Sequence, residues 1–153
     1  MSAARKLSID TVRKSTLDNE FEASIDQAPP VSFRANFARV NYPQLGDCLT
    51  ITATLRDPVS HQIKSIKVIF TEDPIDNTPR RNTGMRIYYG DTAEVPPSEY
   101  STYAPMTALD YNSQTLSISG TIDAHLEDGL EVPKSHDVVM NFSLVAEQDF
   151  RRA

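Results

Sequence analysis

The feature that most constrains this chain is a strict two-residue alternation of apolar and polar side chains. It is clearest over residues 48–56, where Leu49, Ile51 and Leu55 alternate with threonines. A β-strand sends successive side chains to opposite faces, so the alternation predicts strands with one buried and one exposed face. Similar alternation recurs over 21–25, 31–40, 63–70, 85–89, 115–126 and 138–147.

These short strands are separated by turn residues, and no long window has a helical period. The pattern therefore predicts an all-β protein, an antiparallel two-sheet β-sandwich of about seven to nine strands, with a closed β-barrel as the alternative. The three-residue spacing from Ile63 to Ile66 predicts a bulge at Ser65, with a helical turn as the alternative. The expected core is Phe33, Phe37, Leu49, Ile51, Leu55, Ile66, Val68, Phe70, Ile87, Leu116, Ile118, Ile122, Leu126, Met140, Phe142 and Leu144.

A chain of 153 residues fits one domain. We expect a partly flexible N-terminal arm over 1–20, a single β-sandwich domain over 21–148 and a tail over 149–153. The first residues lack the continuous apolar stretch of a Sec-type signal, which predicts a cytoplasmic protein and leaves non-Sec export open. Cys48 is the only cysteine, and its place at the start of a strand predicts a small buried residue.

Charge is distributed unevenly along the chain. Residues 1–86 hold 12 Lys/Arg against 10 Asp/Glu, a net charge of +2, whereas residues 87–153 hold 3 against 11, a net charge of −8. An acidic half repels phosphate backbones, so we expect no nucleic-acid partner. It suits a basic protein partner or a divalent cation, with solubility as the alternative explanation.

Tyrosine is the most suggestive residue type for function. Five of the six tyrosines lie between residues 88 and 111, a region that includes the predicted long irregular connection 90–108. A tyrosine ring combines a rigid apolar face with a polar tip and is enriched in recognition surfaces. The alternative, for Tyr89 and Tyr111, is that they cap the core from strands. The predicted partner-binding residues are Tyr88, Tyr100, Tyr103 and Met106.

Metal and cofactor signals are limited to acidic turns. No spacing matches an EF-hand or a zinc motif, so we expect no cofactor. His125 alternates with apolar neighbours and should point outward, and His136 is expected in a loop. Calcium favours oxygen ligands from flexible loops, with solvated turns as the alternative reading of the same residues. The candidate calcium ligands are Asp123, Glu127, Asp128 and Glu131.

The chain has no nucleophile elbow, phosphate-binding glycine loop or zinc-protease helix, so we expect it not to be an enzyme. The first interpretation is a non-enzymatic binding protein that presents the tyrosine-rich region 88–111 and the acidic C-terminal half to a protein or glycan partner. One alternative is a membrane- or lipid-interacting, toxin-like β-sandwich, which the absence of tryptophan disfavours. Another is a small hydrolase built from loop carboxylates. Edge strands leave a homo-oligomer open.

Overall fold

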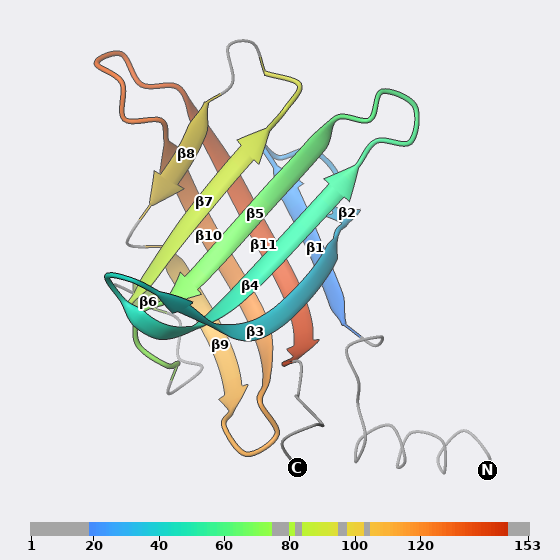
Figure 1. Cartoon of the computed structure of the whole chain (residues 1–153). Helices are drawn as coiled ribbons and strands as arrows, with labels where there is room; N and C mark the ends of the chain where they lie inside the picture. Colours follow the sequence, from blue (N-terminus) through green and yellow to red (C-terminus); the bar gives the residue numbers. More distant parts are fainter. Residues whose placement is uncertain (1–18, 75–79, 82–83, 95–97, 103–104, 147–153) are drawn as a thin grey trace, which may run out of the picture.

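The structure, a computed structural model, describes residues 19–74, 80–81, 84–94, 98–102 and 105–146 (Figure 1). These residues contain no helix, and so none long and apolar enough to cross a membrane. The strands are β1 Glu20–Ile25, β2 Val31–Ser32, β3 Arg34–Tyr42, β4 Gly46–Arg56, β5 Ile63–Phe70, β6 Arg80–Arg81, β7 Met85–Asp91, β8 Glu99–Thr102, β9 Met106–Asn112, β10 Ser117–Glu127 and β11 Ser135–Val145. Nearly all of the expected arm and the whole expected tail lie outside the described residues.

The eleven strands form one antiparallel sheet that curls on itself. Its main path runs β2-β1-β11-β10-β8-β7-β5-β4-β3, while β9 pairs with β10 and β6 pairs with β9. In Figure 1, β3, β4, β5 and β7 form a front layer, and β1, β9, β10 and β11 form a back layer crossed obliquely behind it. β8 joins the layers along one side. The all-β, antiparallel prediction is confirmed, and the barrel alternative describes the arrangement because one hydrogen-bonded sheet supplies both layers.

The opposite side of the barrel is a seam between β3 and the back layer. β3 contacts β11 and β1, and the backbones meet in a single parallel bridge between Phe37 and Ala146. Phe37 is fully buried there. The barrel is therefore nearly closed, and side-chain packing rather than a hydrogen-bonded ladder joins its two edges within the described residues.

The core lies between the layers, as the alternation predicts. Fourteen of the sixteen expected core residues are buried in one hydrophobic cluster, and Leu55 and Leu116 are partly buried against it. Cys48 is buried as expected. Burying apolar side chains stabilises a fold by roughly 1.5 to 3 kcal/mol for each large residue, so this shared interior holds the layers together.

Two local expectations are wrong. The β4–β5 ladder runs without interruption from Leu49↔Phe70 to Arg56↔Ile63, so no bulge forms at Ser65, and Ile63 simply faces outward. The region 90–108 is not one irregular connection, because it contains β8 and the start of β9. Tyr100 and Thr107 occupy its core-facing positions, so the aliphatic side chains that usually reveal a strand are missing there.

Candidate functional site

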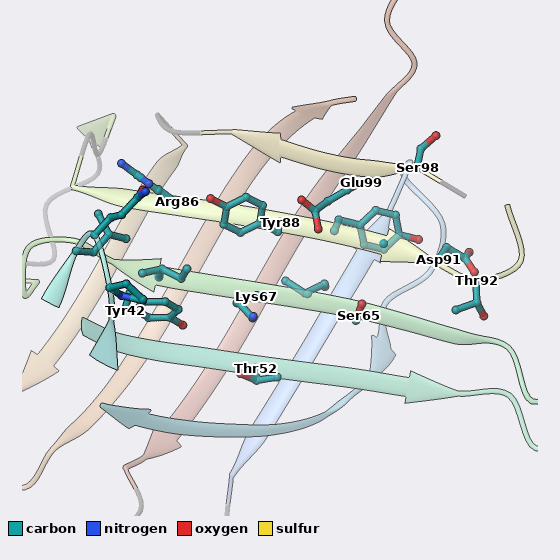
Figure 2. A pocket seen from close by; sticks show the side chains of 17 residues that line it. Tyr42, Thr52, Ser65, Lys67, Arg86, Tyr88, Asp91, Thr92, Ser98 and Glu99 are labelled. Atoms are coloured by element: carbon teal, nitrogen blue, oxygen red, sulfur yellow. The ribbon is translucent and has the colours of Figure 1, made fainter. Parts of the chain in front are cut away.

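An open groove lies on the outer face of the front layer (Figure 2). Its volume is about 930 Å³, and its floor is formed by β4, β5 and β7. The turn after β3 forms one end, and Asp91, Thr92, Ser98 and Glu99 form the other. We call this hollow the outer-face groove. Ligand sites in proteins commonly have volumes of about 300 to 1,000 Å³, so the groove can hold a ligand.

The floor of the groove is a row of neighbouring side chains on adjacent strands. Thr52 pairs with Lys67, and Lys67 pairs with Tyr88. All three point outward because their sequence neighbours on each strand, such as Ile51, Ile66 and Ile87, point into the core. In Figure 2 the Tyr88 ring lies along β7, between the side chains of Arg86 and Glu99.

One end of the groove is covered by the β3–β4 turn. The hydroxyl groups of Tyr42 and Thr50 are hydrogen-bonded at 3.0 Å. Thr50 and Ile69 are buried although they lie on the outer face, since the turn folds over them. Gly46 has a φ of +79°, a conformation that glycine adopts without steric cost, and it closes this tight connection. This end of the groove therefore has a fixed, partly apolar wall.

The other end is fixed by polar contacts around the β7–β8 connection. The Lys64 amine lies 3.3 Å from an Asp91 carboxylate oxygen. The Thr92 hydroxyl accepts a hydrogen bond from the Ile63 N–H at 2.8 Å and donates one to the Gln62 side chain at 2.8 Å. These bonds tie the residues after β7 to the start of β5, so this rim of the groove is preorganised.

Two groups on the floor remain free to bind a ligand. Among the residues that the structure describes, neither the Lys67 amine nor the Tyr88 hydroxyl has a hydrogen-bond or ion-pair partner. Lys67 is exposed and Tyr88 is half-buried. An amine, a phenol and an aromatic face thus lie side by side and are not engaged within the described fold.

The four predicted binding residues do not form one surface. Tyr88 lies in the outer-face groove, whereas Met106 is exposed on β9 in the back layer, paired with Asp123. Tyr100 is buried, because β8 pairs with β7 and turns its ring into the core, so the expectation that it faces a partner is corrected. Tyr103 lies outside the described residues.

A second polar cluster closes one end of the barrel around His136. Its Nδ1 lies 2.6 Å from an Asp26 carboxylate oxygen, and its Nε2 lies 3.1 Å from a Glu94 oxygen. Glu94 also accepts a hydrogen bond from Tyr100. The Tyr89 and Tyr100 rings pack edge-on against the imidazole, with centroids 5.2 and 4.5 Å away.

His136 was expected in a loop, which is wrong. It is the second residue of β11 and pairs with Leu126. His136 faces the same side of β11 as the buried Val138 and Met140. Extending that alternation back by two residues could have revealed its inward orientation from the sequence. Both ring nitrogens of His136 are therefore engaged by carboxylate groups from other parts of the fold.

Ionisation within this cluster follows from its contacts. The hydrogen bond to Glu94 and burial raise the pKa of Tyr100 to about 12, and burial raises the pKa of Tyr89. Burial works against ionisation of Asp26. The hydrogen bonds from the Asp137 N–H and the His136 ring outweigh it and lower the pKa of Asp26. The exposed His125 was expected to point outward and does so, and its hydrogen bond to Asp137 raises its pKa.

We expect the Asp26→Asn variant to be less sensitive to acid than the wild type. Because the folded-state pKa of Asp26 is lowered, its ionised form stabilises the fold above the ordinary value of 3.8, and this contribution is lost as the pH falls through the folded value. Asparagine tolerates the positive φ of this position. The half-exposed carboxylate is screened, so we expect a loss of about 1 kcal/mol at pH 7.

The measurement is the melting temperature between about pH 7 and pH 3, followed by circular dichroism. The difference in melting temperature between the wild type and Asp26→Asn should narrow below about pH 4. Asp123→Asn is the control, since Asp123 is exposed and no hydrogen bond to its carboxylate is found within the described residues. A constant gap across the whole range would contradict the proposed role of Asp26.

The candidate calcium ligands are placed around the β10–β11 connection, but they do not converge. Within the described residues, no group of three or more His, Cys, Asp or Glu side chains could hold a metal ion. Asp128 Oδ1 accepts hydrogen bonds from the Leu130 and Lys134 N–H groups, both at 3.2 Å. Glu127 lies 3.8 Å from the His125 ring. These contacts are those of ordinary turn and surface residues.

A scan of the chain against protein-family models finds no match, and searches of curated proteins and of solved structures return no match either. The fold places the chain among antiparallel all-β proteins with a barrel-like sheet. Such scaffolds support unrelated functions, so the function has to be argued from the outer-face groove itself.

Proposed function

We propose that this protein is a non-enzymatic binding protein that holds a protein or glycan partner in the outer-face groove, with Tyr88 at the centre of the contact. The observation that carries the proposal is the row of side chains on the groove floor. Lys67 and Tyr88 are directed outward side by side, and their polar groups have no partner in the described part of the chain. Unengaged donors beside an aromatic ring are what a binding site needs.

The shape of the groove favours an extended ligand. The hollow is open to solvent and crosses three strands, from the β3–β4 turn to the β7–β8 connection. Both charges line the groove, with Arg86 on one side of Tyr88 and Glu99 on the other (Figure 2). A peptide segment or a sugar chain presents alternating polar groups and flat apolar faces, and tyrosine can contact both kinds of surface.

The rigidity of both ends of the groove supports a role in ligand binding. The Tyr42–Thr50 and Thr92–Gln62 hydrogen bonds hold the groove in shape before a ligand arrives, which lowers the entropy lost on binding. The histidine with two carboxylate partners, His136, is not among the residues that line the groove. Recognition by fixed side chains is therefore the function that these contacts support best.

We expect Tyr88→Ala to weaken ligand binding at least tenfold, because an aromatic anchor at the centre of an interface commonly contributes 2 kcal/mol or more. The probes are a glycan array and an array of short synthetic peptides, screened with the full chain and followed by titration of the best binders. Tyr88→Phe distinguishes the hydroxyl from the ring.

Leu130→Ala is the matched control, since it removes a large exposed side chain from the β10–β11 connection, which does not line the groove. It should leave the affinity unchanged. The proposal is overturned if neither array yields a binder, or if Tyr88→Ala retains full affinity while its circular-dichroism spectrum matches that of the wild type.

A further inference from the structure

The two layers of the barrel carry opposite charge. The front strands β3, β4, β5 and β7 hold six basic residues and two acidic ones, which are Arg34, Arg39, Arg56, Lys64, Lys67 and Arg86 against Asp47 and Asp91. The back strands β1, β9, β10 and β11 hold no Lys or Arg and six acidic residues, which are Glu20, Glu22, Asp110, Asp123, Glu127 and Asp137. The uneven charge along the sequence thus becomes a difference between the two layers of the barrel.

Exposed charges on the two outer faces have matching spacing. On the front, Arg34 pairs with Thr54 on the neighbouring strand. Lys67 lies one strand further across the sheet and two residues along it. On the back, Glu22 lies two strands and one two-residue step from Asp123. In a regular sheet both separations are about 12 Å, from strand spacings of about 4.8 Å and a rise of about 3.4 Å per residue. Two ion pairs can therefore form at once when the faces meet.

Each charged pair also lies next to exposed apolar surface. Tyr88 is the register neighbour of Lys67 on the front. On the back, Asp123 lies between Val139 and Met106, which are 38% and 43% exposed. An interface needs such apolar contacts at its centre, since exposed ion pairs alone contribute little.

We propose that a second copy of this chain occupies the outer-face groove, seated through the acidic outer face of its back layer. This inference rests on the proposed binding function and names the protein partner. The two faces are different surfaces of one molecule, so the contact is head-to-tail, and each copy can both give and receive it. A four-strand face measures about 19 by 24 Å. Its area is smaller than the roughly 800 Å² that each partner buries in a stable interface. The association is therefore weak, reversible and sensitive to salt.

Sedimentation velocity of the full chain tests this proposal. The expected result is association that strengthens with protein concentration at about 20 mM salt and disappears at about 500 mM salt, where charges are screened beyond about 4 Å. A wild-type chain that stays monomeric at low salt up to about 200 µM, well above common micromolar dissociation constants, would overturn it. The glycan and peptide arrays decide the groove's binding function separately, so the two failures are distinguishable.

Charge reversal makes the test specific to the two faces. The front-reversed variant carries Lys67→Glu and Arg34→Glu, and the back-reversed variant carries Glu22→Lys and Asp123→Lys. Each alone should associate at least tenfold more weakly than the wild type, because the two faces of each variant then repel one another. Mixed one to one, they should associate again, since each restores the charge that the other lacks.

The matched control carries Glu72→Lys and Glu131→Lys, two exposed connecting residues whose reversal changes the net charge as much as the back-reversed variant does. It should associate like the wild type. If the control is as defective as the back-reversed variant, or if the mixture fails to recover association while all variants remain folded, the assignment of the two faces is wrong.

Discussion

Replacing Gly120 with alanine is expected to lower the free energy of unfolding by about 2 to 6 kcal/mol. Gly120 lies in β10 with a φ of +144°, a conformation that residues with a Cβ rarely adopt, and such strain costs about 1 to 3 kcal/mol. A Cβ built there would lie 2.1 Å from the Ala108 carbonyl oxygen and 3.0 Å from the Leu109 Cα. Backbone atoms of β9 would have to move, which adds a further cost of about 1 to 3 kcal/mol.

Gly90→Ala is the matched control for this prediction. Gly90 is also within a strand, but the nearest atom to its added Cβ would be the Ser65 hydroxyl oxygen at 3.7 Å, an ordinary contact. Alanine restricts the unfolded chain more than glycine does, so this variant should be as stable as the wild type or slightly more stable. Urea unfolding followed by circular dichroism gives both values. A Gly120→Ala variant with wild-type stability would contradict the close approach of β9 and β10.

The strands with the cleanest alternation were predicted best, because their core-facing positions are aliphatic or aromatic at every second residue. β4 and β10 are examples, with inward-facing Leu49 and Ile51 on one and Ile118 and Ile122 on the other. β8 and β9 were missed because Tyr100 and Thr107 are among their inward residues, and a buried threonine is invisible to a hydrophobic pattern.

The groove was only partly predictable. The density of tyrosines pointed to Tyr88, but tyrosine content does not show which rings face solvent, and Tyr100 faces the core. Side chains from other strands lie beside Tyr88 in the groove. Lys67 becomes its neighbour only through the β5–β7 register, and register between non-consecutive segments is a property of the whole fold. Met106 was grouped with Tyr88 because they are close in sequence, yet the fold places them on opposite layers.

The charge pattern shows the same limit. The acidic second half of the sequence could be counted directly, but the two halves do not correspond to the two layers. Most of β7 is in the second half, yet β7 lies in the front layer. β1 is in the first half, yet it lies in the back layer. Glu20 and Glu22 on β1 therefore join an acidic face that half-chain counting could not assemble. Faces with opposite charge are defined by strand order, which period-two patterns do not specify.

Replacing Phe37 with alanine is expected to lower the free energy of unfolding by about 3 to 5 kcal/mol, the usual cost of truncating a buried phenylalanine. Phe37 is fully buried on β3, the end strand of the sheet, and a parallel bridge pairs it with Ala146 beside the end of β11. Within each layer, ladders of hydrogen bonds between neighbouring strands support the packing. At the seam Phe37 is part of the hydrophobic core, so the loss of its side chain should act on closure as well as on stability.

Hydrogen exchange separates closure from a general loss of stability. In Phe37→Ala, the rate of amide hydrogen exchange should rise more in β3 than in β5, because β5 is paired on both sides by β4 and β7. Val40→Ala is the control on the same strand, because Val40 is 39% exposed and its truncation should change stability by no more than about 0.5 kcal/mol. If Phe37→Ala costs less than about 1 kcal/mol, or raises exchange equally in β3 and β5, then the seam is not held by this side chain and the barrel is closed by other contacts.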